Sequence, residues 1–177
     1  MKTGSLAFLL AVGLPGALAA QTASPAPNAA VGTMRELWKS VTDYITTAAA
    51  EAPEAQYGYR PVATVRSFGQ LIAHIAGAQY LMCAAALGDP AREEDEIERT
   101  KTSKAELVAA LRASTEYCGK AYAQSDADAA RPAQLFGQER TRLYALGLNA
   151  THNGEHYGNI VTYLRMQGSI PPSSRRP

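Results

Sequence analysis

The sequence predicts an all-α protein, a four-helix bundle, and three observations lead to this expectation. Four segments of similar length carry helical patterns of apolar residues, and three of them open with a Ser or Thr followed three residues later by Glu or Gln. Proline or glycine falls in the breaks between these segments. No segment shows a competing strand pattern. Four helices that each bury one apolar face make a bundle.

The N-terminal residues predict export. Lys2 precedes an apolar run from Leu6 to Leu14, and Ala17-Leu18-Ala19 supplies small residues at the two positions where signal peptidase needs them. A membrane span needs about 20 apolar residues, and glycine and proline interrupt this stretch at its end. We therefore expect a signal peptide over residues 1–20, a disordered Ala/Pro-rich linker over residues 21–32, and a periplasmic or secreted protein.

The helical domain is expected to span residues 33–172, followed by a disordered tail over residues 173–177. Gly168 is suited to the left-handed cap of the last helix, and the prolines just beyond it prevent continuation. The four expected helices run over Thr33–Glu51, Ser67–Leu87, Ser103–Gln124, and from within residues 137–141 to Gln167.

Charge and composition exclude two classes of partner. The chain has 17 basic and 16 acidic residues and a formal net charge of +1. No overall field attracts nucleic acid or anionic lipid, so we expect no nucleic acid and, after signal cleavage, no membrane as a partner. The acidic run over residues 93–98 is a candidate cation-binding patch, but we expect it to be solvated surface, as such runs usually are.

The two cysteines predict how the second and third helices are arranged. Cys83 lies sixteen residues after the cap at Ser67, and Cys118 lies fifteen after the cap at Ser103. At 1.5 Å per residue, both reach the same depth only if the helices run parallel. A disulfide needs Cα atoms within about 7 Å. We expect a Cys83–Cys118 bond, parallel helices two and three, and a long crossover over residues 88–102. Two unpaired core cysteines are the alternative.

All three histidines fall on expected core faces. His152 and His156 lie four residues apart, so their side chains stand one turn apart on one face of the fourth helix. His74 lies on the apolar face of the second helix. A lone histidine in such a place is usually a hydrogen-bonded core residue. Three unpaired rings would each cost about 1–3 kcal/mol, whereas one metal satisfies all three. The sequence therefore predicts a divalent metal bound by His74, His152 and His156.

The same segment matches a second motif. Residues 152–156 fit the H-x-x-E-H pattern of inverted zincin proteases, in which Glu155 would be the general base. That site needs a further acidic ligand downstream, and no Asp or Glu follows Glu155. We therefore set the protease aside. Glu155 and Tyr157 stay candidates for proton transfer, and Asn149 and Asn159 are candidates for orienting the histidine rings.

Two segments carry a resemblance to a known family. They are Arg60-Pro61 leading to Val65-Arg66-Ser67-Phe68-Gly69-Gln70-Leu71-Ile72-Ala73-His74-Ile75-Ala76, and Glu155-His156-Tyr157-Gly158-Asn159-Ile160-Val161-Thr162-Tyr163-Leu164-Arg165 with Gly168 and Pro171-Pro172. Together they resemble the DinB/YfiT-like family over roughly the whole helical domain. The resemblance implies an up-down-down-up bundle with a divalent metal on one histidine of helix two and two of helix four. His74, His152 and His156 match those positions.

The resemblance leaves the reaction open. Some members of the family are metal-dependent transferases that use a low-molecular-weight thiol, some are thiol-dependent isomerases, and many have no established activity. Export argues against a thiol cofactor here, because such thiols are cytoplasmic reductants. The resemblance also makes a homodimer plausible.

Three imidazoles leave a tetrahedral metal with one open position, as in catalytic sites. We therefore expect a metal-dependent hydrolase-like or transferase-like enzyme of unknown substrate. Zinc or nickel is the expected metal, with iron and manganese as alternatives. Two other functions stay open: a non-catalytic metal- or ligand-binding module, and a structural bundle in which the metal only joins helices two and four.

Overall fold

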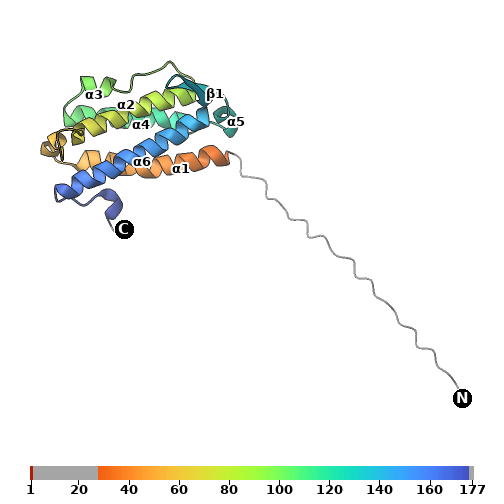
Figure 1. Cartoon of the computed structure of the whole chain (residues 1–177), viewed down its shortest axis with the longest axis horizontal. Helices are drawn as coiled ribbons and strands as arrows, with labels where there is room; N and C mark the ends of the chain where they lie inside the picture. The colour runs from red at the N-terminus through yellow and green to blue at the C-terminus, as the bar shows by residue number, and fades with distance from the viewer. Residues whose placement is uncertain (2–27, 176–177) are drawn as a thin grey trace.

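The computed structural model describes residue 1 and residues 28–175. The expected signal peptide and most of the expected linker lie outside the described residues. Four long helices form the body of the described chain (Figure 1), namely α1 (Ala29–Glu51), α2 (Phe68–Leu87), α4 (Lys104–Ala121) and α6 (Arg142–Met166). The shorter elements are η1 (Glu54–Gly58), α3 (Glu96–Thr100), α5 (Asp126–Ala129), β1 (Pro132–Leu135), β2 (Gln138–Thr141) and η2 (Pro172–Ser174).

Two of the expected capping boxes are confirmed. The Ser67 hydroxyl accepts a hydrogen bond from the Gln70 amide, while the Gln70 side chain accepts one from the Ser67 amide. Ser103 and Glu106 make the same reciprocal pair at the start of α4. Each pair satisfies backbone donors that the first turn leaves without intrahelical partners. α2 and α4 therefore begin where the sequence predicts.

The expected start of the first helix was wrong. α1 begins at Ala29, so residues 29–32 of the expected linker are helical, and the Thr33 hydroxyl donates inside the helix to the Ala29 carbonyl. The cap comes from a distant part of the chain. The Asp126 carboxylate accepts hydrogen bonds from the amides of Ala30 and Val31, at 3.1 and 2.9 Å. Because this acceptor lies about a hundred residues away in sequence, no local pattern reveals it.

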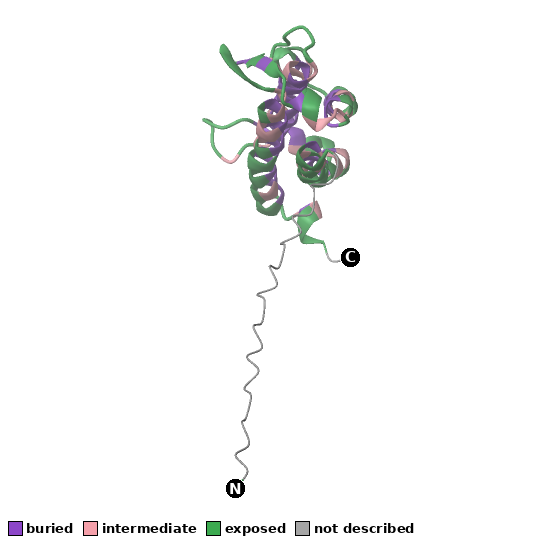
Figure 2. Cartoon of the chain, turned by 90° about the vertical axis from the view of Figure 1, so that its right-hand side faces the viewer, coloured by how far each residue is buried: buried purple, intermediate pink, exposed green. Residues whose placement is uncertain are grey.

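α2 is the central helix of the core. It packs against both α4 and α6, and α1 closes the other side of α6. Figure 2 shows the buried residues gathered on the faces that the helices turn toward one another. α2 is long and apolar enough to cross a membrane, but 72% of that stretch is buried inside the protein. The high hydropathy of α2 is therefore that of a buried core helix.

The disulfide between α2 and α4 is confirmed. Cys83 and Cys118 are bonded, with Cα atoms 5.3 Å apart. Nearer the helix starts, Gly69 lies against Leu107, and Gln79 donates to Ser114 between these two levels. The contacts thus follow one another in the same order along both helices.

The structure contains a β-hairpin that the sequence did not predict. β1 and β2 pair antiparallel, with Pro132 opposite Thr141 and Leu135 opposite Gln138. Phe136 and Gly137 form the turn with φ of 52° and 73°, the left-handed conformations that two-residue hairpins require. Only Ala133 and Leu135 of the eight strand residues are buried. This alternation is too short to stand out from the neighbouring polar residues.

We expect the disulfide to contribute about 3–4 kcal/mol to the free energy of unfolding, because it restricts a loop of 35 residues in the unfolded chain. Urea unfolding of the folded domain, followed by circular dichroism with and without reductant, measures this difference. The double variant Cys83→Ala/Cys118→Ala is the control and should not respond to reductant. An equal midpoint for the oxidised and reduced wild-type protein would contradict the expectation.

Candidate metal centre

The three histidines meet at one point in the core. His74 comes from α2, and His152 and His156 come from successive turns of α6. The Nε2 atom of His152 lies 3.2 Å from Nε2 of His74 and 3.0 Å from Nε2 of His156. A ring nitrogen from each residue lies within 4.8 Å of those from the other two. The structure thus brings together all three expected metal ligands.

Burial keeps these rings uncharged. It lowers the pKa of His74 to about 3 and that of His152 to about 4, and it also lowers the pKa of His156. The positive charge of Arg66 lowers all three pKa values further. At neutral pH each ring therefore offers a lone pair, which is the form that binds a metal.

The donor set fits a divalent cation. Imidazole nitrogens bind zinc at about 2.0–2.1 Å, and nitrogens 3.0–3.2 Å apart are close enough to share an ion at that distance. Among the described residues, the three converging Nε2 atoms have only one another as hydrogen-bond partners, and each pair holds at most one proton between its two atoms. A cation is the one partner that accepts all three lone pairs at once.

The two asparagines have different surroundings. The Asn159 amide lies 3.5 Å from Nδ1 of His156, as expected for a residue that orients a ligand ring. Asn149 makes no hydrogen bond to a histidine among the residues that the structure describes. Its side chain donates to the Tyr122 hydroxyl at 3.1 Å, beside the two disulfide sulfurs. Only Asn159 is therefore placed to orient a ring.

The two candidates for proton transfer lie on other faces of α6. Glu155 is exposed and lies about 100° around the helix from His156. Tyr157 is buried, and its hydroxyl donates to Ser173 and accepts from the Ser173 amide. Its ring stacks on Tyr44 of α1. The structure does not bring Tyr157 to the imidazoles, because its hydroxyl is engaged with the segment after α6.

Glu94 lies at the site, although the sequence predicted solvated surface for it. Its carboxylate oxygen is 3.7 Å from Nε2 of His74 and 4.0 Å from Nε2 of His152. Glu94 belongs to the crossover between α2 and α4, and its backbone lies directly on Gly77 of α2. The sequence assigns Gly77 to helix two and Glu94 to the crossover, but nothing in it shows where a crossover of this length passes.

A buried polar layer adjoins the histidines. Gln79 of α2 accepts from the indole of Trp38 at 3.0 Å and donates to Ser114 at 3.0 Å. Asn153, the residue after His152, donates to Thr42 at 3.1 Å and lies 3.4 Å from the Gln79 oxygen. These bonds connect all four long helices. Because they fix the rotation of α2 and α6 about their axes, they also fix the direction of the imidazoles.

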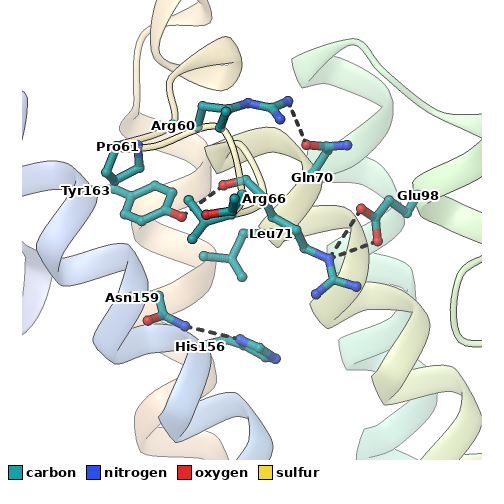
Figure 3. A pocket seen from close by; sticks show the side chains of 12 residues that line it. Arg60, Pro61, Arg66, Gln70, Leu71, Glu98, His156, Asn159 and Tyr163 are labelled. Carbon is teal, nitrogen blue, oxygen red and sulfur yellow. Dashed lines mark hydrogen bonds and ion pairs between the residues drawn. The ribbon is translucent and has the colours of Figure 1, made fainter.

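A cavity of about 650 Å³ reaches the site from one side. His156 lines it together with Asn159 and Tyr163, and the Tyr163 hydroxyl donates to the Arg66 carbonyl. Figure 3 shows the Arg66 side chain extending across the cavity toward Glu98 of α3, which it contacts at 3.1 Å. The other lining residues come from the segment before α2 and from its first turn, namely Arg60, Pro61, Ala63, Thr64, Val65, Gln70 and Leu71.

Solved structures with a similar fold include two DinB-like proteins. The one from Bacillus cereus has a TM-score of 0.69 and 15% identity, with 80% of this chain and 95% of that chain covered. The one from Bacillus subtilis has a TM-score of 0.64 and 22% identity, with 82% and 99% covered. The mycothiol-dependent maleylpyruvate isomerase has a TM-score of 0.59 and 17% identity, with 82% and 78% covered. Identities this low show a shared fold alone.

Sequence comparison gives the family. No curated protein matches the chain. The sequence model of the DinB superfamily matches residues 20–160, which include the three histidines and most of the described helices. The match covers well over half of the chain, and it agrees with the resemblance carried by the segments around His74 and His156. The chain therefore belongs to the DinB superfamily.

Proposed function

We propose that this protein is an exported metal-dependent enzyme, hydrolase-like or transferase-like, that holds a divalent cation on His74, His152 and His156. The observation that carries the proposal is the convergence of three neutral imidazole nitrogens beside a cavity. A metal held there would act as a Lewis acid on a substrate oxygen or sulfur. Zinc and nickel are the proposed ions, with iron and manganese as alternatives, since imidazole donors suit several of these ions.

The cavity favours an enzyme over a structural metal site. Its volume of about 650 Å³ is within the range of small-molecule pockets, and His156 connects it to the proposed metal. Arg60 and Arg66 line the same cavity, and Glu98 pairs with only one of these two cations. An anionic group on the substrate would find a partner there, close to the histidines whose pKa values Arg66 already lowers. We therefore propose a small substrate that carries such a group.

Export bears on whether the protein uses a low-molecular-weight thiol as a cofactor. The N-terminal pattern of a basic residue, an apolar run and small residues supports export, and the Cys83–Cys118 bond is of the kind that oxidising compartments maintain. The similarity to a mycothiol-dependent isomerase raises a thiol-dependent reaction as the second candidate. An oxidising compartment disfavours it, because a free low-molecular-weight thiol would be scarce there.

Two further proposals concern architecture. The contacts between α2 and α4, which follow the same order along both helices, support an up-down-down-up arrangement of the four long helices. An apolar groove between α1 and α6, with Leu37 and Tyr144 exposed beside it, supports the proposed homodimer. Sedimentation of the folded domain would test the second proposal, and a monomer at all concentrations would exclude it.

Replacing any one of the three histidines by alanine should weaken metal binding by more than about 100-fold, since even residues that only orient metal ligands contribute 10–100-fold. Competition with a chromophoric chelator measures the affinity for zinc and nickel. Thr151→Ala is the matched control, because Thr151 is exposed and adjacent to His152 on α6. Wild-type affinity in His152→Ala would contradict the proposed site.

Removing the metal should leave the bundle folded. The core contains two clusters of buried apolar residues and a disulfide that do not involve the ion. Circular dichroism of the chelator-treated protein should keep its helical signal, and thermal unfolding should stay cooperative. Loss of helix on metal removal would instead favour a structural role for the metal, because its binding would then be part of folding.

Turnover should depend on the metal. A screen of esters, amides, phosphoesters and thiol-transfer substrates with the metal-loaded protein should yield at least one reaction that the triple-histidine variant lacks. Arg60→Gln removes the cavity cation that Glu98 does not pair with, and it should then raise KM for an anionic substrate more than for a neutral analogue of the same size. Absence of any metal-dependent rate would favour the non-catalytic binding module. An equal effect on both substrates would exclude the proposed anion contact.

A further inference from the structure

We propose that Glu94 is a fourth ligand of the metal, supplied by the crossover between α2 and α4, so that the site is a three-histidine, one-carboxylate centre. This inference rests on the proposed metal function and adds a ligand from outside the two helices that carry the histidines. It assigns a role to one residue of the acidic run over residues 93–98.

The position of the carboxylate supports this role. One oxygen of Glu94 lies 3.7 Å from Nε2 of His74 and 4.0 Å from Nε2 of His152, the atoms that converge on His156. These separations exceed a direct hydrogen bond, so the carboxylate is not held by the rings themselves. They are small enough that a modest rotation of the side chain places the oxygen on an ion shared by the imidazoles. Two-thirds of the side chain is already withdrawn from solvent, with 33% exposed.

The charges around Glu94 set it apart from its acidic neighbours. Glu93 and Asp95 both pair with Arg99, at 2.5 and 2.6 Å, and Glu98 pairs with Arg66. Within residues 28–175, the only basic side chains within 4.0 Å of the Glu94 carboxylate are His74 and His152. Neither an arginine nor a lysine pairs with Glu94 among these residues. A divalent cation between the two rings would give the carboxylate a positive partner, and carboxylates are common ligands of such ions.

The backbone of the crossover holds Glu94 at this level of α2. Gly77 lies three residues after His74, on the neighbouring turn of the helix. A Cβ atom at Gly77 would fall 1.8 Å from the Glu94 carbonyl oxygen, so only glycine permits this approach. Because that contact is between backbones, it fixes the distance of the crossover from α2 more strictly than a flexible side chain would. Gly77 therefore determines how near the Glu94 carboxylate comes to the histidines.

Glu94 lies on a side of the histidine cluster that does not line the cavity. It lies against His74 and His152, whereas His156 is the one member of this group that lines the cavity. A carboxylate ligand there leaves the side at His156 for substrate. Four protein ligands complete a tetrahedral ion, so an open position then requires an ion that takes five or more ligands. Nickel, iron and manganese meet this condition more readily than zinc.

The variant Glu94→Gln keeps the size of the side chain and removes its charge. In the folded protein it should bind cobalt and nickel at least about tenfold more weakly than wild type. It should also change the visible absorption of bound cobalt, which reports the donor set and the coordination number. Glu93→Gln is the matched control, because Glu93 belongs to the same run but pairs with Arg99. The control should match wild type in affinity and spectrum.

Gly77→Ala tests the same inference through the backbone. The added methyl group must push the crossover outward, so cobalt affinity and spectrum should change as in Glu94→Gln. Gly119→Ala is the control, because nothing lies within 4 Å of a Cβ atom at that position of α4. Circular dichroism and thermal unfolding verify that both variants fold. A folded Gly77→Ala variant with wild-type cobalt binding would overturn the placement of Glu94 by this contact.

The outcomes separate this inference from the metal proposal. Weakened binding and an altered cobalt spectrum in Glu94→Gln, together with loss of binding in His152→Ala, support both. Wild-type affinity and spectrum in Glu94→Gln, with binding still lost in His152→Ala, would overturn the carboxylate ligand and leave the three-histidine site standing. If the wild-type protein binds no metal ion, both the proposed metal site and the proposed role of Glu94 are wrong.

Discussion

The pairing of α2 with α4 at equal depth is the constraint on which the rest of the structure depends. The Cys83–Cys118 bond joins the two helices in the middle of the core, and their contacts follow the same order from one end to the other. The chain must therefore return along the bundle between the end of α2 and the start of α4. That return is the crossover, and it passes over the helix that carries His74.

The site combines two kinds of support. The histidines stand on long helices whose rotation is fixed by the buried bonds of Gln79 and Asn153, so their directions are set before any ligand arrives. Such preorganisation reduces the cost of assembling a functional site. The other groups at the site come from the crossover and from the segment before α2.

The sequence predicted the parts of this site that depend on local rules. Helical spacing placed His152 and His156 on one face, capping residues located the starts of α2 and α4, and distance along each helix paired the cysteines. It failed where a contact depends on tertiary structure. The start of α1 depends on Asp126, and the surroundings of Glu94 depend on the path of the crossover. Neither can be derived from the residues on either side in the sequence.

The surroundings of Trp38 have a practical consequence for work on this family member. Trp38 is the only tryptophan of the chain. Its indole stacks on the ring of Tyr122, with the ring centroids 4.4 Å apart, and its N–H donates to the Gln79 side chain. The fluorescence of the protein under selective excitation thus comes from one fixed location, where α1 meets the polar layer beside the histidines. Trp38 is therefore an intrinsic fluorescence probe, which responds to the packing around the site without any added label.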